Sequence, residues 1–244
     1  MKFIAIIPAR YASTRFPGKP LVEIHGLPMI QHVYQQSLKA FEQVVVATDD
    51  QRIADVVKSF GGNVVLTSSE HPSGTDRVAE AAKLLSEHFE FDVVVNVQGD
   101  EPFIDPEQLF QIKQCFDDPQ TDIATLIVPI TSTEVLFDSN KVKAVSNSNG
   151  FALYFSRLPI PFQRDYPEQE WLKHHTYFLH VGIYAYRTEV LDTISKLKQT
   201  PLEQSEMLEQ LRWLENGYRI KTAHTAHGNI GIDTPNDLTK LPTQ

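Results

Sequence analysis

The first half of the chain alternates short apolar runs with longer runs in which apolar residues recur at a helical spacing. The short Val- and Ile-rich runs predict strands, and the longer amphipathic runs predict helices. Continuous apolar runs such as Val93-Val94-Val95 are typical of strands covered on both faces, so we predict an α/β fold whose mostly parallel sheet is flanked by helices. The predicted order is strand 3–7, helix 28–40, strand 44–47, helix 51–60, strand 63–66, helix 75–87, strand 92–97, helix 106–116 and strand 123–128.

The pattern changes after about residue 130. Two short apolar runs on either side of Asn147-Ser148-Asn149-Gly150 predict an antiparallel hairpin. We therefore predict one domain over residues 1–244, with an inserted antiparallel section at about 130–215. Its elements are a hairpin at 141–155, an irregular Pro- and aromatic-rich stretch at 158–175, a strand at 179–186 and helices at 189–196 and 203–216, followed by a capped turn at 232–238.

Composition narrows the class of protein. The net charge is −9 and the pI about 5.4, whereas a nucleic-acid-binding protein usually carries a basic face, so we expect no nucleic-acid partner. No apolar run reaches membrane-spanning length and the N-terminus lacks a signal-peptide pattern, so we expect a cytoplasmic protein without a membrane partner. Cys115 is the single cysteine, which excludes an intrachain disulfide, and its amphipathic surroundings predict a buried apolar role.

The loop after the first predicted strand carries the clearest chemistry. Arg10, Arg15 and Lys19 place three cations at the carboxyl edge of a parallel sheet, where open α/β sheets bind ligands. Arginine forks onto phosphate oxygens and lysine supplies a compact charge, while Ser13 and Gly18 favour close contact of the backbone with anions. A solvated loop is the alternative, but this density and placement of cations favour a triphosphate site.

Other phosphate-binding and metal-binding motifs are absent from the sequence. Gly18-Lys19 is followed by Pro20, so the loop is not a Gly-Lys-Ser/Thr phosphate loop. No G-x-G-x-x-G follows the first strand, which argues against an NAD-linked oxidoreductase, and no H-E-x-x-H occurs.

Two further segments carry polar residues at strand ends. Asp100 follows an apolar strand and Gly99, and a carboxylate there suits Mg²⁺ bound to substrate phosphates. Asp233 offers a second carboxylate, although taken alone it is a turn or helix cap. The segment 71–77 offers donors and acceptors for a base edge, although Ser and Thr before a helix usually only cap it.

Together these segments resemble the 3-deoxy-manno-octulosonate (Kdo) cytidylyltransferases over essentially the whole chain. The opening loop is shared with other sugar nucleotidyltransferases, whereas VNVQGDEP, ALYFSR and EMLEQLR are more specific to the Kdo enzymes. The motifs, in the order and spacing of that family, are IIPARYASTRFPGKPL, HPSGTDR, VVVNVQGDEP, ALYFSR, HVGIYAYR, LEQSEMLEQLRWLENG and GIDTPNDL.

The resemblance implies a Rossmann-like nucleotidyltransferase fold whose inserted section forms a homodimer. It also implies transfer of CMP from CTP to Kdo, which activates Kdo for lipopolysaccharide biosynthesis. Arg10, Lys19, Asp100 and Asp233 would be catalytic, with Mg²⁺ on the two aspartates. CTP would contact Pro8, Ala9, Arg10, Ser13, Lys19, Ser73, Gly74, Thr75 and Arg77, and Kdo would contact Arg15, Gln98, Arg157, His180, Tyr184, Glu209 and Gln210.

Taken residue by residue, the acceptor positions have simpler interpretations. His180 in a strand is ordinarily a hydrogen-bonded core histidine, and Tyr184 is ordinarily a packing residue. Two alternatives therefore stay open at this point. One is a cytidylyltransferase for another acidic sugar, such as sialic acid or 8-amino-Kdo, and the other is a catalytically silent nucleotide-binding protein on the same scaffold.

Overall fold

The structure, a computed structural model, describes residues 1–12, 16–229, 231–232 and 234–240. The chain divides into two units, which are described separately. The first contains Met1–Phe110, Ala185–Ser195 and Asn229–Gln244, and the second contains Gln111–Tyr184 and Lys196–Gly228. The prediction of a single domain with an insertion at about 130–215 stays a prediction.

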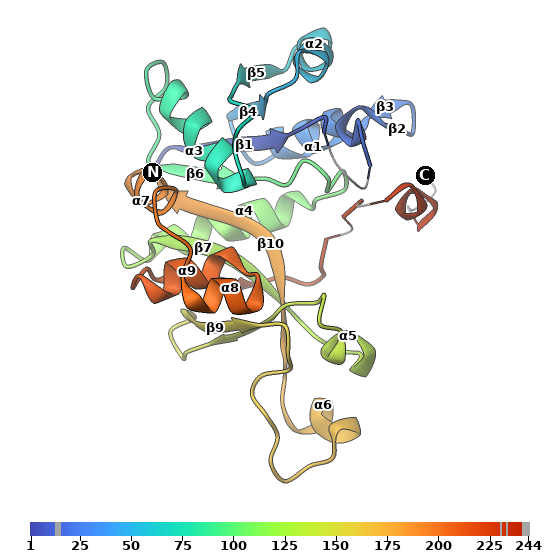
Figure 1. Cartoon of the computed structure of the whole chain (residues 1–244), viewed down its shortest axis with the longest axis vertical. Helices are drawn as coiled ribbons and strands as arrows, with labels where there is room; N and C mark the ends of the chain where they lie inside the picture. Colours follow the sequence, from blue (N-terminus) through green and yellow to red (C-terminus); the bar gives the residue numbers. More distant parts are fainter. Residues whose placement is uncertain (13–15, 230, 233, 241–244) are drawn as a thin grey trace. The chain divides into compact units, whose positions relative to one another are not determined.

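Four parallel strands form the sheet of the first unit (Figure 1). Strand β1 (Phe3–Ala9) pairs with β4 (Gln43–Thr48) on one side and with β6 (Val93–Asn96) on the other, and β5 (Asn63–Leu66) pairs with β4. Ile4 to Ile7 and Val93 to Val95 are buried, as expected for β-branched residues in strands covered on both faces. The predicted parallel sheet is confirmed.

Helices connect these strands at the positions that the sequence predicts, and polar side chains cap the starts of two of them. Asp50 accepts the Arg52 N–H at the start of α2, and Ser73 accepts the Asp76 N–H at the start of α3. The helices and short elements are α1 (Met29–Leu38), α2 (Gln51–Ser59), α3 (Gly74–Leu85), α4 (Pro106–Gln114), α7 (Thr188–Ile194), the 3-10 turns η1 (Lys19–Leu21) and η4 (Pro235–Lys240), and the short pair β2 (Glu23–Ile24) and β3 (Leu27–Pro28).

The second unit is built on mixed strands. Strand β7 (Ile123–Pro129) pairs in parallel with β11 (Ile220–His224) and neighbours β10 (Phe178–Arg187). The predicted hairpin is confirmed, because β8 (Lys143–Ser146) pairs antiparallel with β9 (Ala152–Ser156) and with β10. The remaining elements are η2 (Cys115–Asp117), α5 (Thr133–Phe137), η3 (Glu168–Glu170) and α6 (Trp171–His174).

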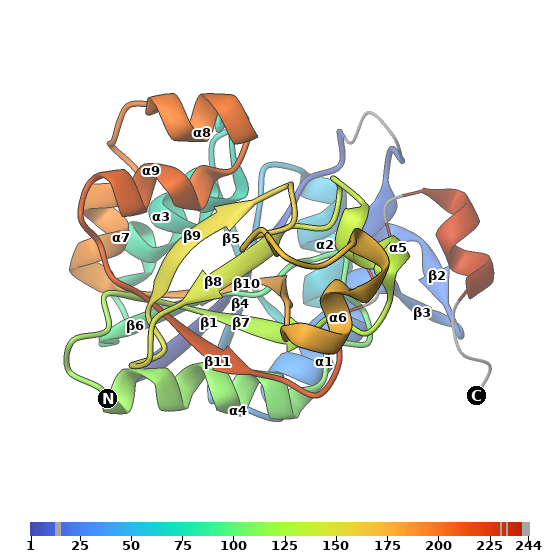
Figure 2. The same cartoon turned by 90° about the horizontal axis from the view of Figure 1, so that it is seen from below.

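The single helix predicted at 203–216 is wrong. Two helices, α8 (Pro201–Glu206) and α9 (Glu209–Glu215), pack against each other, and α9 packs on β9 (Figure 2). Met207 interrupts them in the left-handed conformation, with φ 52° and 74% of its surface exposed. The local pattern favours helix throughout, so the break is a tertiary effect: Arg157 donates hydrogen bonds to the backbone carbonyls of Glu206 and Met207.

Two details of the second unit bear on the sequence analysis. Strand β11 was not predicted, because its alternation of apolar and polar residues is short. Cys115 is buried, and burial raises the pKa of its thiol to about 12, in agreement with an inert packing role. Among the described residues of the whole chain, no helix combines the length and apolar character needed to cross a bilayer.

Candidate functional site

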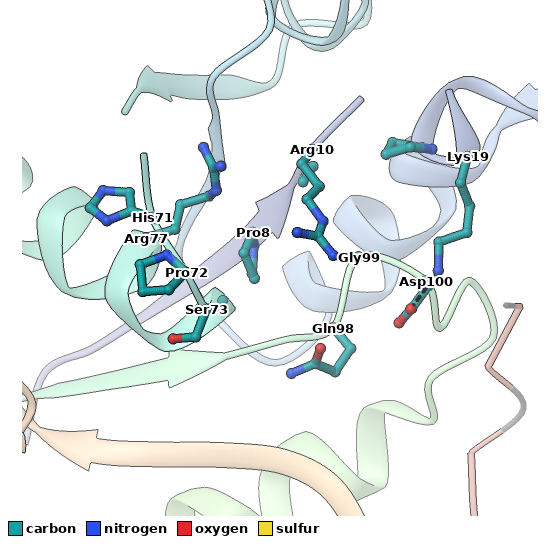
Figure 3. A pocket seen from close by; sticks show the side chains of 13 residues that line it. Pro8, Arg10, Lys19, His71, Pro72, Ser73, Arg77, Gln98, Gly99 and Asp100 are labelled. Carbon is teal, nitrogen blue, oxygen red and sulfur yellow. Dashed lines mark hydrogen bonds and ion pairs between the residues drawn. The ribbon is translucent and has the colours of Figure 1, made fainter. Parts of the chain in front are cut away.

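A cavity of about 390 Å³ opens in the first unit at the carboxyl ends of β1 and β6 and the start of α3 (Figure 3). This is the edge at which open parallel sheets bind ligands. Figure 3 shows His71 and Arg77 on one side of the cavity and Lys19 and Asp100 on the other. The lining residues are Pro8, Ala9, Arg10, Lys19, Pro20, His71, Pro72, Ser73, Gly74, Arg77, Gln98, Gly99 and Asp100.

Lys19 and Asp100 form an ion pair within this cavity. The Lys19 Nζ lies 2.7 Å from the Asp100 Oδ2, and the two side chains are 14% and 32% exposed. Opposite charges at this separation attract each other. The cavity therefore presents a cation and a carboxylate from segments 81 residues apart, and these groups suit a phosphate and a metal ion respectively.

The loop that carries Lys19 is closed at its base by Tyr11. The Gly18 N–H donates to the Tyr11 carbonyl at 2.9 Å, and Gly18 has a φ of +72°. A Cβ on Gly18 would lie 3.2 Å from the Tyr11 ring, so both conformation and space favour glycine here. The Arg52 guanidinium stacks 3.3 Å from the centroid of the Tyr11 ring. Ser13 and Arg15, the other predicted contacts of this loop, lie outside the described residues.

Gly99 has a structural reason in addition to its place in the cavity lining, where a glycine would let the backbone approach a ligand. A Cβ at Gly99 would lie 2.7 Å from the Pro8 carbonyl oxygen, at the end of β1. Gly99 therefore allows the loop that carries Asp100 to run against the first strand.

The chain near Asp100 is tied to the C-terminal segment. The Ile232 N–H donates to the Asp100 carbonyl at 2.9 Å, and Asn229 donates a hydrogen bond to the Glu101 carboxyl group. Burial, reinforced by the neighbouring Asp100 charge, raises the pKa of Glu101 to about 7. Asp233, the second predicted carboxylate, lies outside the described residues.

The predicted nucleotide residues at the start of α3 have structural partners as well. Ser73 caps the helix, and its hydroxyl donates to the Asp76 carboxylate at 2.7 Å. The buried Arg77 donates to the Thr67 hydroxyl at 2.7 Å and pairs with Asp49 at 3.3 Å. Thr75 is buried in α3 and does not line the cavity.

Three lining residues had no individual role in the sequence analysis: Pro20, His71 and Pro72, the last two within the segment 71–77. Each of these residues lies in one of the family motifs, beside a predicted site residue, and this position could have identified it as part of the site. The His71 Nε2 contacts the Glu80 carboxylate. Burial raises the pKa of Glu80, but hydrogen bonds from His71 and Ser68 outweigh it and hold this pKa below its ordinary value.

Of the predicted acceptor residues, Gln98 lines the cavity of the first unit, whereas Arg157, His180, Tyr184, Glu209 and Gln210 belong to the second unit. Within that unit the His180 ring lies 5.2 Å from the rings of Phe155 and Tyr184, and its Nε2 lies 2.9 Å from the Thr125 hydroxyl. Burial lowers the pKa of His180 to about 4, so its imidazole is neutral at physiological pH.

The Arg157 side chain reaches three backbone carbonyls of the second unit. It donates to Glu206 at 2.6 Å, to Ser139 at 3.1 Å and to Met207 at 3.3 Å. The Glu206 carboxylate in turn accepts the Arg157 N–H at 2.9 Å. This network fixes the corner between α8 and α9, and Glu209 begins the second of these helices.

Comparisons with known proteins point to one family. A family profile described as Cytidylyltransferase matches residues 4–220. Proteins named 3-deoxy-manno-octulosonate cytidylyltransferase are similar over 98% of this chain and 96% of their own length: 57% identical in Bacteroides thetaiotaomicron and 56% identical in Parabacteroides distasonis. A solved CMP:2-keto-3-deoxy-manno-octonic acid synthetase complexed with CTP is 43% identical, with a TM-score of 0.89, over 98% of this chain and 96% of that one.

A more distant neighbour bears on the fold alone. A 4-diphosphocytidyl-2C-methyl-D-erythritol synthase from Anaerococcus prevotii is 14% identical and has a TM-score of 0.61, over 98% of this chain and 96% of that one. The predicted nucleotidyltransferase fold is confirmed by these neighbours.

Proposed function

The chain belongs to the cytidylyltransferase family, and we propose that it transfers CMP from CTP to the anomeric 2-hydroxyl of Kdo, which yields CMP-Kdo and pyrophosphate. The observation that carries this proposal is the 57% identity, over nearly the full length, with a relative that bears the name of that activity. A cavity lined by Arg10, Lys19 and Asp100 at the ligand-binding edge of the sheet agrees with it.

The cations of the cavity would act on the leaving group. The 2-hydroxyl of the sugar loses its proton to solvent as its oxygen attacks the α-phosphorus, the bond from that phosphorus to the bridging oxygen breaks, and pyrophosphate departs. Charge then grows on the departing phosphates, and Arg10 and Lys19 would stabilise it electrostatically. No covalent enzyme intermediate is required, so we assign no nucleophile to the protein.

A divalent cation, specifically Mg²⁺, forms part of the proposal. The described residues contain no group of three or more His, Cys, Asp and Glu side chains arranged around a common point. Mg²⁺ commonly takes only one or two protein carboxylates together with substrate phosphates and water, so the partly exposed carboxylate of Asp100 fits it. Asp233 would supply the other. When bound, the ion would lower the pKa of the sugar hydroxyl and neutralise phosphate charge.

The remaining residues would position the substrates. Pro8, Ala9, Ser73, Gly74 and Arg77 line the cavity beside the cations, and we assign them with Ser13 and Thr75 to CTP. Arg15, Gln98, Arg157, His180, Tyr184, Glu209 and Gln210 are assigned to Kdo. Orientation of two bound reactants supplies much of the acceleration in such a transfer. A homodimer and a cytoplasmic location complete the proposal.

One assay tests the proposed function. Pyrophosphate release is measured with each of the four nucleoside triphosphates, with and without Kdo, in the presence of Mg²⁺. We expect release only with CTP and Kdo together. Parallel reactions with sialic acid and 8-amino-Kdo separate the alternative acceptors. If no acceptor supports release, the catalytically silent interpretation replaces this proposal.

A further inference from the structure

Thr125, a buried residue of β7, makes three short contacts through a single hydroxyl group. Its Oγ1 lies 2.8 Å from the carbonyl oxygen of Ile183, 3.2 Å from that of Val181 and 2.9 Å from the Nε2 of His180. All four residues belong to the second unit. Thr125 lies outside the family motifs and is not among the residues that we propose to contact CTP, Kdo or Mg²⁺.

Proton accounting decides the direction of these hydrogen bonds. A threonine hydroxyl has one proton to donate and two lone pairs, whereas a backbone carbonyl oxygen only accepts. If the hydroxyl donated its proton to His180, its oxygen would face the Ile183 carbonyl at 2.8 Å with no hydrogen between them. Two electronegative oxygens repel at that distance, so the proton goes to a carbonyl. Thr125 is therefore the acceptor toward His180.

The surroundings of His180 determine which of its two ring nitrogens carries the proton. Its backbone N–H donates to Val142 at 2.8 Å, the ring meets Phe155 edge-on, and Tyr184 lies 5.2 Å away on centroid distance. Burial keeps the imidazole neutral, so the ring carries only one proton. Because Nε2 donates to Thr125, that proton is on Nε2, and Nδ1 keeps a lone pair.

We propose that Thr125 fixes the tautomer of His180 and thereby makes Nδ1 a hydrogen-bond acceptor for a hydroxyl group of the acceptor sugar. The second half of this statement rests on the proposed function, which places His180 at the acceptor. An acid sugar offers hydroxyl donors and one carboxylate, which only accepts. His180 would therefore select a hydroxyl of the sugar and would not bind its carboxylate, and Thr125 acts as a positioning residue.

The tautomer is measured directly in the protein without substrates. Long-range ¹H–¹⁵N correlation spectra of the full chain labelled with [¹⁵N]histidine separate a protonated ring nitrogen from an unprotonated one, and the signals lost in His180→Gln identify the residue. We expect a protonated Nε2 and an unprotonated Nδ1 between about pH 6 and 8. A protonated Nδ1, or a charged ring in this range, would overturn the proposal.

Kdo then serves as the probe of the second half. On titration with Kdo in the presence of CMP, the Nδ1 signal of His180 is expected to move while that nitrogen stays unprotonated, as an acceptor of a hydroxyl proton does. Protonation of Nδ1 on binding would indicate a donor to the carboxylate and would contradict the assignment. A titration in which Kdo binds but the Nδ1 signal of His180 does not move would contradict the assignment of Nδ1 as an acceptor as well.

A variant series links the tautomer to turnover. Thr125→Val removes the acceptor while keeping the shape, so we expect an Nδ1-protonated form to appear and the KM for Kdo to rise about tenfold, with the KM for CTP unchanged. Thr125→Ser should restore both properties. Thr222→Val is the matched control, because it removes another buried hydroxyl of the same unit, bonded to Ser146 and Gly150.

The outcomes separate this proposal from the proposed function. If the wild-type protein releases no pyrophosphate with Kdo, the function fails while the tautomer in the substrate-free protein stands. If Kdo is a substrate but Thr125→Val leaves both its KM and the His180 signals unchanged, the positioning role fails and the function stands. An equal effect of Thr222→Val would reduce Thr125 to a structural residue.

Discussion

The cavity of the first unit, which we propose for CTP, and the proposed acceptor cluster of the second unit differ in how their own residues are held. The cluster consists of Thr125, Arg157, His180 and Tyr184. The cavity is made of strand-end loops that carry an exposed Arg10 and a partly exposed Asp100. In the cluster, Thr125 and Tyr184 are buried, and hydrogen-bond contacts join residues far apart in the chain: Thr125 meets His180 at a separation of 55 residues, and Arg157 meets Glu206 at a separation of 49.

This difference separates two kinds of recognition. A triphosphate is bound by charged side chains, whose attraction extends over several ångströms and does not require that the side chains be buried. A sugar acid is distinguished by the direction of individual hydrogen bonds, which requires side chains whose protons and rotamers are already determined. We therefore expect substitutions in the cavity to affect CTP and the chemical step, and substitutions in the cluster to affect Kdo.

The largest effect is expected from Asp100→Asn. Loss of the carboxylate removes the proposed anchor of the metal ion and the partner of Lys19, so turnover should fall by about 10²–10³-fold, the scale seen when one electrostatic contributor is removed. Pyrophosphate release at saturating CTP and Kdo measures it. Asp55→Asn, on the exposed face of α2, serves as the control. Near-normal turnover with Mg²⁺ would contradict the role of Asp100 as a ligand.

Lys19→Ala comes next. Removal of one charge-assisted hydrogen bond to phosphate should raise the KM for CTP by about 10- to 100-fold and leave the KM for Kdo within a factor of about two. Initial rates with each substrate varied in turn supply both constants. Lys39→Ala, an exposed lysine at the end of α1, is the matched control. A CTP dependence equal to that of the wild type would remove Lys19 from the phosphate site.

Arg157→Ala should show the reverse pattern. With CTP saturating, the KM for Kdo should rise about tenfold, because the variant loses both a proposed acceptor contact and the bonds that fix the corner between α8 and α9. Arg164→Ala, an exposed arginine of the same unit, is the control. A rise confined to the KM for CTP would break the comparison between the two regions.

The smallest expected effect is the contribution of His180 to the pH dependence of the free energy of unfolding. Because burial lowers the pKa of His180 to about 4, the unfolded chain binds this proton between about pH 6.5 and 4 while the native state does not. The free energy of unfolding should therefore fall as the pH drops through that window, and His180→Gln should lose this component. Urea unfolding of both proteins at several pH values tests the slope.

His88→Gln, which removes an exposed histidine, is the control for that slope. If wild type and His180→Gln show the same pH dependence, the pKa of His180 is not lowered in the native state, and its ring would gain a proton near pH 6.5.

The helix–strand rhythm of the first half was predictable because period and turn signals are local. Asp50 and Ser73 cap helices that begin within a residue of their predicted starts. The break at Met207 was not predictable, because the local preference there favours helix, and the contacts that accompany the break come from Arg157, which follows the end of β9 and lies 50 residues away in the chain. The role of Gly99 likewise depends on the Pro8 carbonyl, a neighbour that only the folded sheet supplies.

By itself the sequence determined the α/β class, the mostly parallel sheet of the first half, the cation-rich loop and the family, since these depend on residue type and spacing. The tertiary structure alone decided that Lys19 pairs with Asp100, that Arg77 is bound to Thr67 and Asp49, and that the Thr125 hydroxyl lies 2.9 Å from the His180 Nε2. The physical reason is that hydrogen bonds and ion pairs depend on distance and direction in space, which residue spacing along the chain does not encode.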